Sequence, residues 1–257
     1  MDETPNRLPD AADPDAEIGG DHPRLRVGGF EPLTTVEWDG RLSAVVFLQG
    51  CPWKCRYCHN AELTPLTTAG MSPWAETLKQ IEARRGFIDA VIFSGGEPTL
   101  QSQLPDAISE VARMGFEVAL HTNGFDANAL QAALDTGSLD FVAMDIKAPF
   151  EDYELITQIP SSGRGARESA RVLLGAHAGA EFRTTYHPAL LTHNHLRAIA
   201  RELAALGATR WVVQLFRAEG CPVSWLRESR ALPARLPEDL RAELAAQIAD
   251  FDVRGAD

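Results

Sequence analysis

Short runs of hydrophobic residues alternate along the chain with longer stretches in which hydrophobic residues recur every three or four positions. The short runs are continuous and rich in β-branched residues, which is typical of strands buried on both faces of a parallel sheet. The longer stretches are amphipathic and predict helices. Strands are predicted at residues 44–49, 87–93, 117–121, 139–146, 181–186 and 210–216.

Helices are predicted between these strands, and one more is predicted after the last of them. Ser72 followed by Pro73 is typical of a helix start, with the serine as N-cap and the proline at the first helical position. The predicted helices cover residues 72–85, 103–114, 126–135, 166–178, 193–206 and 236–251.

The alternation of strand and helix predicts an α/β fold with a parallel sheet and right-handed crossovers. Six strands are too few to close an eight-stranded barrel, so we predict an incomplete (β/α)6 barrel with parallel strands. Residues 27–38 precede an Asp39-Gly40 turn and are predicted to add a short strand beside the first barrel strand. Residues 161–165, which consist mainly of serine and glycine, are predicted to be a mobile connection.

The beginning of the chain differs in composition from the rest. Residues 1–24 are acidic, contain four prolines and offer little to bury, so they predict a disordered leader. Residues 25–257 are predicted to form a single core domain with a C-terminal helix.

The composition and net charge of the chain limit the classes of function that it can have. The chain has 257 residues, of which 45% are hydrophobic, and this is enough for the core of one large domain. A net charge of -12 argues against general affinity for nucleic acid or anionic membranes, and neither is expected as a partner. Apolar runs stay well below the roughly 20 residues of a membrane span, and the N-terminus lacks a signal-peptide pattern. We therefore expect a cytoplasmic protein.

Three of the four cysteines lie together, directly after the first predicted strand. Cys51, Cys55 and Cys58 have the spacing C-x3-C-x2-C, which fits a metal cluster in a reducing compartment rather than disulfides. A structural zinc site takes four ligands, and a four-iron cluster normally takes four thiolates. Three thiolates would leave one iron open to an outside ligand. The alternatives are a zinc site with a remote ligand such as His59, or unconnected thiols.

The other predicted strands also end in polar or glycine-rich sequence. Because the carboxyl ends of parallel strands meet at one edge of a barrel, these residues are expected to converge on one site with the cysteines. They are Gly95, Gly96 and Glu97, then His121, Thr122 and Asn123, then Asp145 and Lys147, then Arg183 and His187, and finally Arg217.

The cysteine motif, with Tyr57 before its last cysteine, and the following strand that ends in Gly-Gly-Glu-Pro resemble the radical S-adenosylmethionine (SAM) superfamily. Flanking sequences resemble the anaerobic ribonucleoside-triphosphate reductase activating proteins, which belong to the glycyl-radical-enzyme activases. The resemblance covers about residues 26 to 222. The flanking sequences are those at 27–30, 49–52, 57–60, 121–124 and 145–149.

This resemblance implies a reaction and its cofactors. Cys51, Cys55 and Cys58 are the implied ligands of three irons of a [4Fe-4S] cluster, and the amino and carboxylate groups of SAM are implied at the fourth iron. Reductive cleavage of SAM then yields a 5′-deoxyadenosyl radical, which takes a hydrogen atom from a backbone glycine of the partner. In such chemistry the protein positions and shields its cofactors.

The resemblance also implies contacts to SAM. Tyr57 is implied beside the adenine, with plain packing as the alternative. Gly96 is implied at the methionine amino group, with Glu97 in support, and Gly95 is expected to help the backbone approach.

Asp145 and Lys147 alternate on their predicted strand and are expected to point the same way. The acid is expected at the ribose and the lysine at the SAM carboxylate, with an internal ion pair as the alternative. His59 is expected to hydrogen-bond near the cluster sulfurs. Further cofactor contacts are expected from Thr122, Asn123, Arg183 and Arg217.

Two positions depart from the family pattern. In activases of pyruvate formate-lyase, an aspartate after the third strand joins a methionine and an aspartate of the fourth in a monovalent cation site. Met144 and Asp145 match, but His121 stands in place of the first aspartate, either as a polar lid on the SAM pocket or as a satisfied histidine. Arg217 stands where those relatives carry a histidine that meets SAM, and a planar donor can serve there.

The implied partners are an anaerobic (class III) ribonucleotide reductase and reduced flavodoxin or ferredoxin as electron donor. The alternatives are a radical SAM enzyme that acts on another glycyl radical enzyme or on a small molecule or peptide, such as a deazapurine precursor, and a zinc or redox-sensing module. Cys221 is expected to be a partly buried free thiol, with electron entry or partner contact as the alternative.

Overall fold

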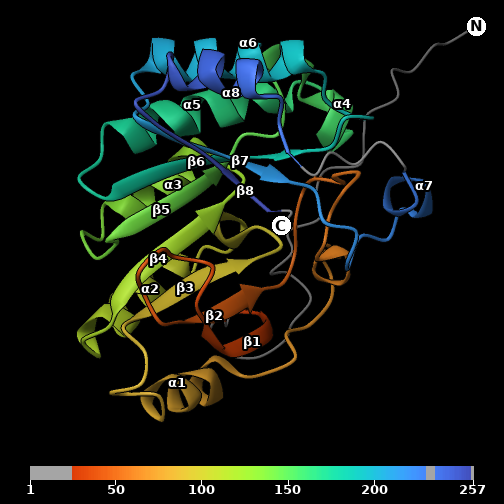
Figure 1. Ribbon diagram of the computed structural model, residues 1–257. Helices are drawn as coiled ribbons and strands as arrows, with labels where there is room; N and C mark the ends of the chain where they lie inside the picture. The colour runs from red at the N-terminus through yellow and green to blue at the C-terminus, as the bar shows by residue number, and fades with distance from the viewer. Residues whose placement is uncertain (1–24, 230–234, 256–257) are drawn as a thin grey trace, which may run out of the picture.

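The computed structural model describes residues 25–229 and 235–255; the predicted leader, 1–24, lies outside them. One curved sheet holds eight strands in sequence order (Figure 1). Its first strand is antiparallel to the second, and every later neighbouring pair is parallel. The strands are β1 (Val27–Thr34), β2 (Ser43–Leu48), β3 (Ala90–Gly95), β4 (Glu117–Thr122), β5 (Phe141–Asp145), β6 (Gly179–Tyr186), β7 (Arg210–Leu215) and β8 (Asp250–Arg254).

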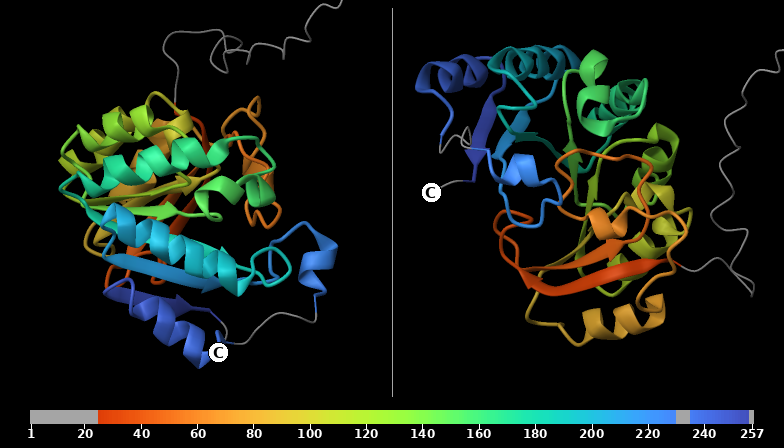
Figure 2. Two further views of the ribbon diagram at one scale, coloured as in Figure 1. Left: turned by 90° about the horizontal axis from the view of Figure 1, so that it is seen from above. Right: turned by 90° about the vertical axis from the view of Figure 1, so that its right-hand side faces the viewer.

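The larger helices cover one face of this sheet and leave the other to line an incomplete barrel (Figure 2), so the predicted α/β architecture is confirmed. In the described segments we find no helix with the length and apolar character needed to cross a membrane. The helices are α1 (Trp74–Glu82), α2 (Leu104–Arg113), α3 (Ala127–Leu134), α4 (Glu154–Thr157), α5 (Ser162–Leu174), α6 (His193–Leu206), α7 (Ser224–Arg227) and α8 (Glu238–Ala245), with 3-10 turns η1 (Ala61–Leu63), η2 (Pro98–Leu100) and η3 (Phe150–Asp152).

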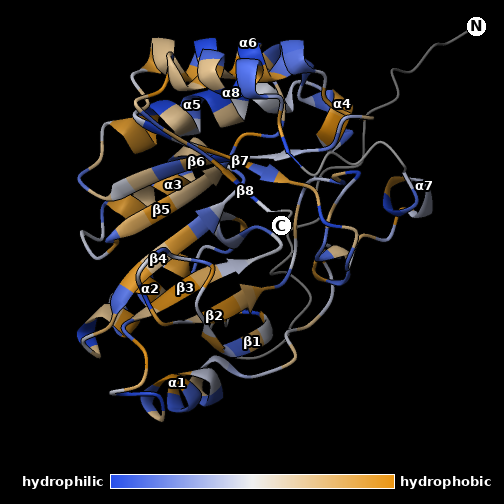
Figure 3. Cartoon of the chain, viewed as in Figure 1, coloured by the Kyte–Doolittle hydropathy of each residue, from blue (hydrophilic) through white to orange (hydrophobic). Residues whose placement is uncertain are grey.

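Alternate strand residues serve two different cores, because successive side chains of a strand point to opposite faces. Val46, Phe93 and Leu120 are fully buried in the continuous core between sheet and helices. The strand ribbons are accordingly mostly hydrophobic (Figure 3). A second, small apolar cluster consists of Val45, Ile92 and Ala119 with Trp38, Phe47 and Phe141 packed against it.

The β1–β2 connection, residues 35–42, is here called the hairpin loop, and it spans the open side of the barrel. Trp38 stacks on Phe141 of β5, with ring centroids 5.1 Å apart and an angle of 14° between the rings. Asp39 accepts a hydrogen bond of 2.6 Å from Arg254 of β8. The loop therefore joins the first pair of strands to the middle and the far edge of the sheet.

Beneath the open end of the barrel, one buried acid forms ion pairs with three arginines. The Glu181 side chain is 4% exposed and pairs with Arg183 at 2.6 Å, Arg254 at 2.8 Å and Arg210 at 3.0 Å. Burial opposes its ionisation, but the arginines hold the pKa of Glu181 below its usual value. Arg183 also donates to the Glu37 carbonyl at 3.0 Å. The barrel floor is thus a paired charge network that is tied to the hairpin loop.

The predicted helix at 236–251 is wrong over its second part. The helix α8 ends at Ala245, and residues 250–254 form β8, which pairs in parallel with β7. Three charged residues alternate with Phe251 and Val253 in this strand, so the pattern has a period of two over only five residues. The charged positions are stabilised by partners such as Arg210, which donates to Asp250 at 2.5 Å.

The start of the first helix and of the next strand also differ from expectation. Ser72 is not the N-cap of α1: Pro73 holds that position without a side-chain cap bond. The backbone of Ser72 instead bridges to Val27 of β1. Phe87 is 75% exposed, and the strand begins only at Ala90, because residues 83–88 form the turn that follows the helix.

Residues 161–165 were predicted to be a mobile connection, but residues 162–165 form the first turn of α5. Gly163 is buried there, and a Cβ on it would lie 1.8 Å from the carbonyl oxygen of Phe150. Gly165 packs similarly, because its Cβ would lie 2.5 Å from the Phe125 carbonyl oxygen. The glycines therefore allow close packing of the helix on its neighbours. The observed helix α5 starts and ends about four residues earlier than the helix predicted at 166–178.

Gly163→Ala is expected to destabilise the fold, although alanine is favoured over glycine in a free helix by roughly 1 kcal/mol. The collision with the Phe150 carbonyl should lower the free energy of unfolding by about 1–3 kcal/mol. Gly175→Ala is the matched control, since its φ is -84° and the nearest atom to its added Cβ is 3.6 Å away. Urea unfolding of the two variants checks this, and equal stabilities would contradict it.

Candidate active site

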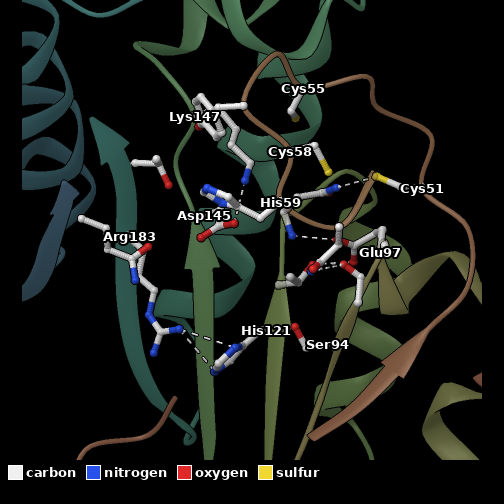
Figure 4. A pocket seen from close by; sticks show the side chains of 18 of the residues that line it. Cys51, Cys55, Cys58, His59, Ser94, Glu97, His121, Asp145, Lys147 and Arg183 are labelled. Atoms are coloured by element: carbon white, nitrogen blue, oxygen red, sulfur yellow. Dashed lines mark hydrogen bonds and ion pairs between the residues drawn. The ribbon is translucent and has the colours of Figure 1, made fainter. Parts of the chain in front are cut away.

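The carboxyl ends of the parallel strands open onto a cavity of about 710 Å³ (Figure 4). Every residue that the sequence analysis assigned to the iron-sulfur cluster or to SAM lines this cavity. They are Cys51, Cys55, Tyr57, Cys58, His59, Gly95, Gly96, Glu97, Thr122, Asn123, Asp145, Lys147, Arg183 and Arg217.

The cysteine loop is held by its neighbours through backbone hydrogen bonds. The connection between β5 and α5 accepts two of them, from Lys54 N to Thr157 O and from Arg56 N to Ile156 O, both at 3.1 Å. These two bonds flank Cys55, so that cysteine is fixed between them. The segment around η1 holds the start of the loop, where Cys51 N donates to a carbonyl at 3.1 Å.

The three thiols face the cavity in surroundings that do not favour free thiolates. Burial raises the pKa of Cys51 to about 12 and that of Cys55 to about 11, and it also raises the pKa of Cys58. Thiolates here are expected only with a metal beside them, since metal coordination deprotonates a thiol. Within 25–229 and 235–255, no three His, Cys, Asp or Glu side chains converge on one point as a single ion requires. The three thiols of this loop face one cavity, and a cubane cluster takes each thiolate at a different iron, so this donor set fits one.

Gly95 and Gly96 are required by backbone packing. A Cβ on Gly95 would lie 2.3 Å from the Leu48 nitrogen, and one on Gly96 would lie 2.2 Å from the Gly50 oxygen. The close approach lets Gly96 N donate to Leu48 O at 2.9 Å, while Glu97 N donates to Gly50 O at 2.8 Å. The glycine pair therefore extends the pairing of β2 and β3 to the base of the cysteine loop. Its expected contact with methionine stays a prediction.

Glu97 is completely buried, and hydrogen-bond donors surround its carboxylate. One oxygen accepts from Thr122 Oγ1 at 2.7 Å and from both the backbone N–H and the hydroxyl of Thr99. The other accepts from Asn123 N at 2.7 Å. Burial raises the pKa of Glu97, and these donors oppose the rise. Glu97 thus joins the end of β3 to the end of β4 and acts on the cavity through its neighbours.

Lys147 and Asp145 form the internal ion pair that was the alternative expectation. Lys147 Nζ lies 2.6 Å from Asp145 Oδ2 and 5.7 Å from the centre of the Tyr57 ring. Burial opposes protonation of the lysine, but the Asp145 carboxylate raises its pKa well above the usual value. The Tyr57 hydroxyl is buried and makes no hydrogen bond of normal geometry, with Thr185 as its polar neighbour. The pair still faces the cavity, where Asp145 is 40% exposed.

His121 and Arg183 contact each other on the floor of the cavity. Arg183 Nη1 lies 3.4 Å from His121 Nε2, while its Nε is paired with Glu181 (Figure 4). Burial, and then the charge of Arg183, hold the pKa of His121 well below its usual value, which favours the neutral ring. His121 therefore has Arg183 as a partner while it also lines the cavity, so both expectations for it stay predictions. Of the two residues that match the cation site of pyruvate formate-lyase activases, Met144 is buried and Asp145 is paired with Lys147.

His59 connects the cysteine loop to the end of β7. Its Nε2 donates to the Arg217 carbonyl at 2.8 Å, and its ring stacks on Phe216 at 5.5 Å. That nitrogen is engaged away from the cysteine sulfurs. Arg217 itself lines the cavity from the β7 side, in line with its predicted place after the strand.

Two residues of the predicted strand ends and loops lie away from the cavity lining. His187 is fully buried, and its ring contacts the backbone of Ala189 and Leu226. Cys221 is 1% exposed, and its thiol approaches the Val223 carbonyl at 4.0 Å. Cys221 is therefore more deeply buried than the partly buried thiol that the sequence predicted.

Sequence reasoning missed several residues of the cavity lining. Strand parity could have found some of them, because they stand two positions from a predicted site residue or opposite another residue of the lining. Thr185, for example, follows Arg183 by two positions and pairs with Gln214. The missed residues are Glu37, Phe47, Asn60, Ser94, Thr185, Gln214 and Glu219.

Comparison with known sequences gives a consistent family. The model of the radical SAM superfamily matches residues 45–178. A protein of Methanocaldococcus jannaschii, assigned as a glycyl-radical enzyme activating enzyme, is 32% identical over 183 residues, which are 68% of this chain and 74% of that protein. The pyruvate formate-lyase-activating enzyme of Clostridium pasteurianum is 31% identical over 148 residues, 55% of this chain and 59% of that one. The pyruvate formate-lyase 1-activating enzyme of Escherichia coli is 36% identical over 106 residues, 39% of this chain and 42% of the enzyme.

Solved structures share the fold. SuiB of Streptococcus suis, bound to its precursor peptide SuiA, superposes with a TM-score of 0.58 at 12% identity, over 82% of this chain and 48% of SuiB. TYW1 with a lysine-pyruvate adduct superposes with a TM-score of 0.57 at 12% identity, over 79% of this chain and 72% of TYW1. At these identities the likeness concerns the fold alone.

Proposed function

The chain belongs to the radical SAM superfamily, and from that premise we propose that it activates an anaerobic ribonucleoside-triphosphate reductase by placing a radical on one of its glycines. The cofactors of this family, a [4Fe-4S] cluster and SAM, are those that the cysteine motif predicted. One observation carries the proposal: three cysteines of one loop line the same cavity as the ends of β3, β4 and β5.

The residues around the cavity divide into two groups in this proposal. Cys51, Cys55 and Cys58 hold the cluster, and their loop is fixed by the backbone bonds to the β5–α5 connection. When bound, the cluster and SAM supply the 5′-deoxyadenosyl radical that removes a hydrogen atom from the partner's glycine.

The second group orients SAM. Lys147 carries three N–H donors, and one of them is hydrogen-bonded to Asp145. The others are available to bind the SAM carboxylate. The half-exposed Asp145 can accept from ribose hydroxyls, and the Tyr57 ring lies beside Lys147, where the adenine is expected. We propose Arg217 as a further contact from the β7 side.

Lys147→Met is expected to weaken SAM binding by roughly 10- to 100-fold, because a hydrogen bond to a charged group contributes about 1.5–3 kcal/mol. Methionine keeps an unbranched apolar stem against Tyr57, so the cluster should load normally. Equilibrium dialysis of SAM against the loaded protein measures the affinity, and visible absorbance reports the cluster. The control is Lys79→Met, which removes a 76% exposed lysine of α1. Unchanged SAM affinity in Lys147→Met would remove this residue from the site.

The proposed electron donor is reduced flavodoxin or ferredoxin, and the proposed location is the cytoplasm, where such reductants and reduced thiols coexist. A second candidate target is pyruvate formate-lyase, because two of the relatives are activating enzymes of that protein. Both targets would present a glycine to the same cavity.

An activation assay tests the proposal and separates the two targets. Loaded protein, SAM and reductant are incubated without oxygen with either the large subunit of an anaerobic ribonucleotide reductase or pyruvate formate-lyase. Electron paramagnetic resonance (EPR) then reports the glycyl-radical doublet. A doublet with the reductase alone supports the proposed target, and a doublet with pyruvate formate-lyase alone replaces it. SAM cleavage with no doublet on either protein would overturn activation of these enzymes.

A further inference from the structure

One side chain outside the cysteine loop points its N–H group at a cysteine of the loop. Asn123, in the turn after β4, has its Nδ2 3.6 Å from Cys51 Sγ, within hydrogen-bond distance for sulfur (the dashed line at Cys51 in Figure 4). Among the described residues, no other side-chain N–H donates to a sulfur of this loop. The sequence had suggested Asn123 only as a contact of the cofactors in general.

The orientation of this amide follows from its other contact. Asn123 Oδ1 accepts a hydrogen bond from Phe125 N at 2.9 Å. If the amide were turned around, its NH2 group would face the N–H of Phe125, and two donors would oppose each other. The oxygen therefore stays on Phe125, and the NH2 group is left facing the sulfur.

The backbone of Asn123 is fixed as well. Its N–H donates to Glu97 at 2.7 Å, and Glu97 is completely buried with its other oxygen bonded to Thr122 and Thr99. Asn123 itself is 7% exposed. A side chain that is held at both its backbone and its carbonyl oxygen can present its donor at a constant distance, as a tuning contact requires.

A donor at a cluster sulfur has a definite electrostatic effect. The reduced cluster carries one more negative charge than the oxidised cluster, and part of that charge lies on the thiolate sulfurs. An N–H group that points at such a sulfur stabilises the reduced form more than the oxidised form and so raises the reduction potential. The lining near Cys51 also contains the acid Glu97, whose influence has the opposite sign.

We propose that Asn123 is a positioning and tuning residue of the cluster: its hydrogen bond to Cys51 raises the reduction potential and eases the one-electron reduction that SAM cleavage requires. Glu97 acts through it, by fixing the turn from which the amide points. This inference rests on the proposed function, because it needs the cluster on Cys51, Cys55 and Cys58. It goes further by assigning Asn123 to a cysteine sulfur rather than to SAM.

The test is an EPR-monitored redox titration of the loaded protein without SAM and without any partner. Asn123→Leu removes the donor and keeps a side chain of similar size, and it is expected to shift the midpoint potential to more negative values. Gln214→Leu is the matched control, because Gln214 is an amide in the same cavity but lies on β7 and has no hydrogen bond to a sulfur. The shift in Asn123→Leu should exceed any shift in Gln214→Leu, at equal iron and sulfide content.

If Asn123→Leu does not bind a cluster, a second pair of variants tests the same inference. Asn123→Asp keeps the oxygen that accepts from Phe125 and places an acceptor with negative charge at the sulfur, so it should lower the potential further. Gln214→Glu adds the same charge to the cavity without contact to Cys51. A potential in Asn123→Asp that is no lower than in Gln214→Glu overturns the inference, as does an unchanged potential in loaded Asn123→Leu.

The outcomes separate this inference from the proposed function. If the wild-type protein takes up no iron-sulfur cluster, both are overturned. If the wild-type protein loads and yields a glycyl radical while the Asn123 variants keep its potential, the inference alone fails.

Discussion

Replacement of Cys55 by alanine is expected to abolish cluster binding and SAM cleavage completely. The loop holds only three thiols that face the cavity, so two remaining thiolates cannot retain a cluster whose fourth iron has no protein ligand. Cys55 is also the thiol fixed between two backbone bonds to the β5–α5 connection. Iron and sulfide content, visible absorbance and chromatographic detection of 5′-deoxyadenosine measure the loss.

Cys221→Ala is the matched control for this variant, because Cys221 is the one cysteine outside the loop. Its thiol is buried in the hydrophobic core, approaches the Val223 carbonyl at 4.0 Å and does not line the cavity, so its loss should leave the cluster and SAM cleavage intact. Substantial 5′-deoxyadenosine from Cys55→Ala would show that the ligand assignment is wrong. Loss of the cluster in Cys221→Ala would show that the fourth cysteine takes part in binding it.

Glu97→Ala is expected to lower the free energy of unfolding by roughly 3 kcal/mol or more. The substitution removes the acceptor of four donors, which come from Thr99, Thr122 and Asn123, and each buried donor left unpaired costs about 1–3 kcal/mol. For a chain of this size, such a loss lowers the melting temperature on the order of 10 °C. Calorimetry of the protein before cluster loading measures the effect on the fold alone.

Glu202→Ala provides the comparison for that result. Glu202 is partly buried too, but its carboxylate accepts only one hydrogen bond, from Phe150 N at 3.0 Å. Its replacement should cost about 1 kcal/mol, in keeping with the loss of a single bond. If the two alanine variants melted at the same temperature, Glu97 would not have the anchoring role that its contacts indicate.

The part of the fold that follows from local pattern was predictable. Buried parallel strands read as continuous apolar runs, and β2 to β7 were found in this way with errors of a few residues at their ends. The strand β8 was missed because five residues with three charges look like the end of the amphipathic helix before them. Its charges are satisfied by Arg210 and Asp39, and the second of these lies 215 residues away from Arg254. No local pattern reports such a partner.

In the candidate site, too, local sequence pattern predicted part of the arrangement and contacts between distant residues determine the rest. Strand parity and the position after a strand predicted which side chains reach the cavity, and the cysteine motif predicted the family, which the sequence comparisons confirm. Which contacts each side chain makes in the cavity depends on partners from other strands. Arg183 lines the cavity, and its guanidinium contacts Glu181, the Glu37 carbonyl and His121, of which the last two lie on other elements; its expected contact with the cofactor stays a prediction.

The hairpin loop also has a consequence for how the protein is made. Asp39 emerges early from the ribosome, whereas Arg254 belongs to the strand farthest along the described chain, and the contact between them closes a very long loop. Contacts of such sequence separation form late. Until then Glu181 lacks one of its three counter-charges, and the barrel stays open on one side. We therefore expect chains that stop before β8 to be cleaved faster by added protease than the full chain is.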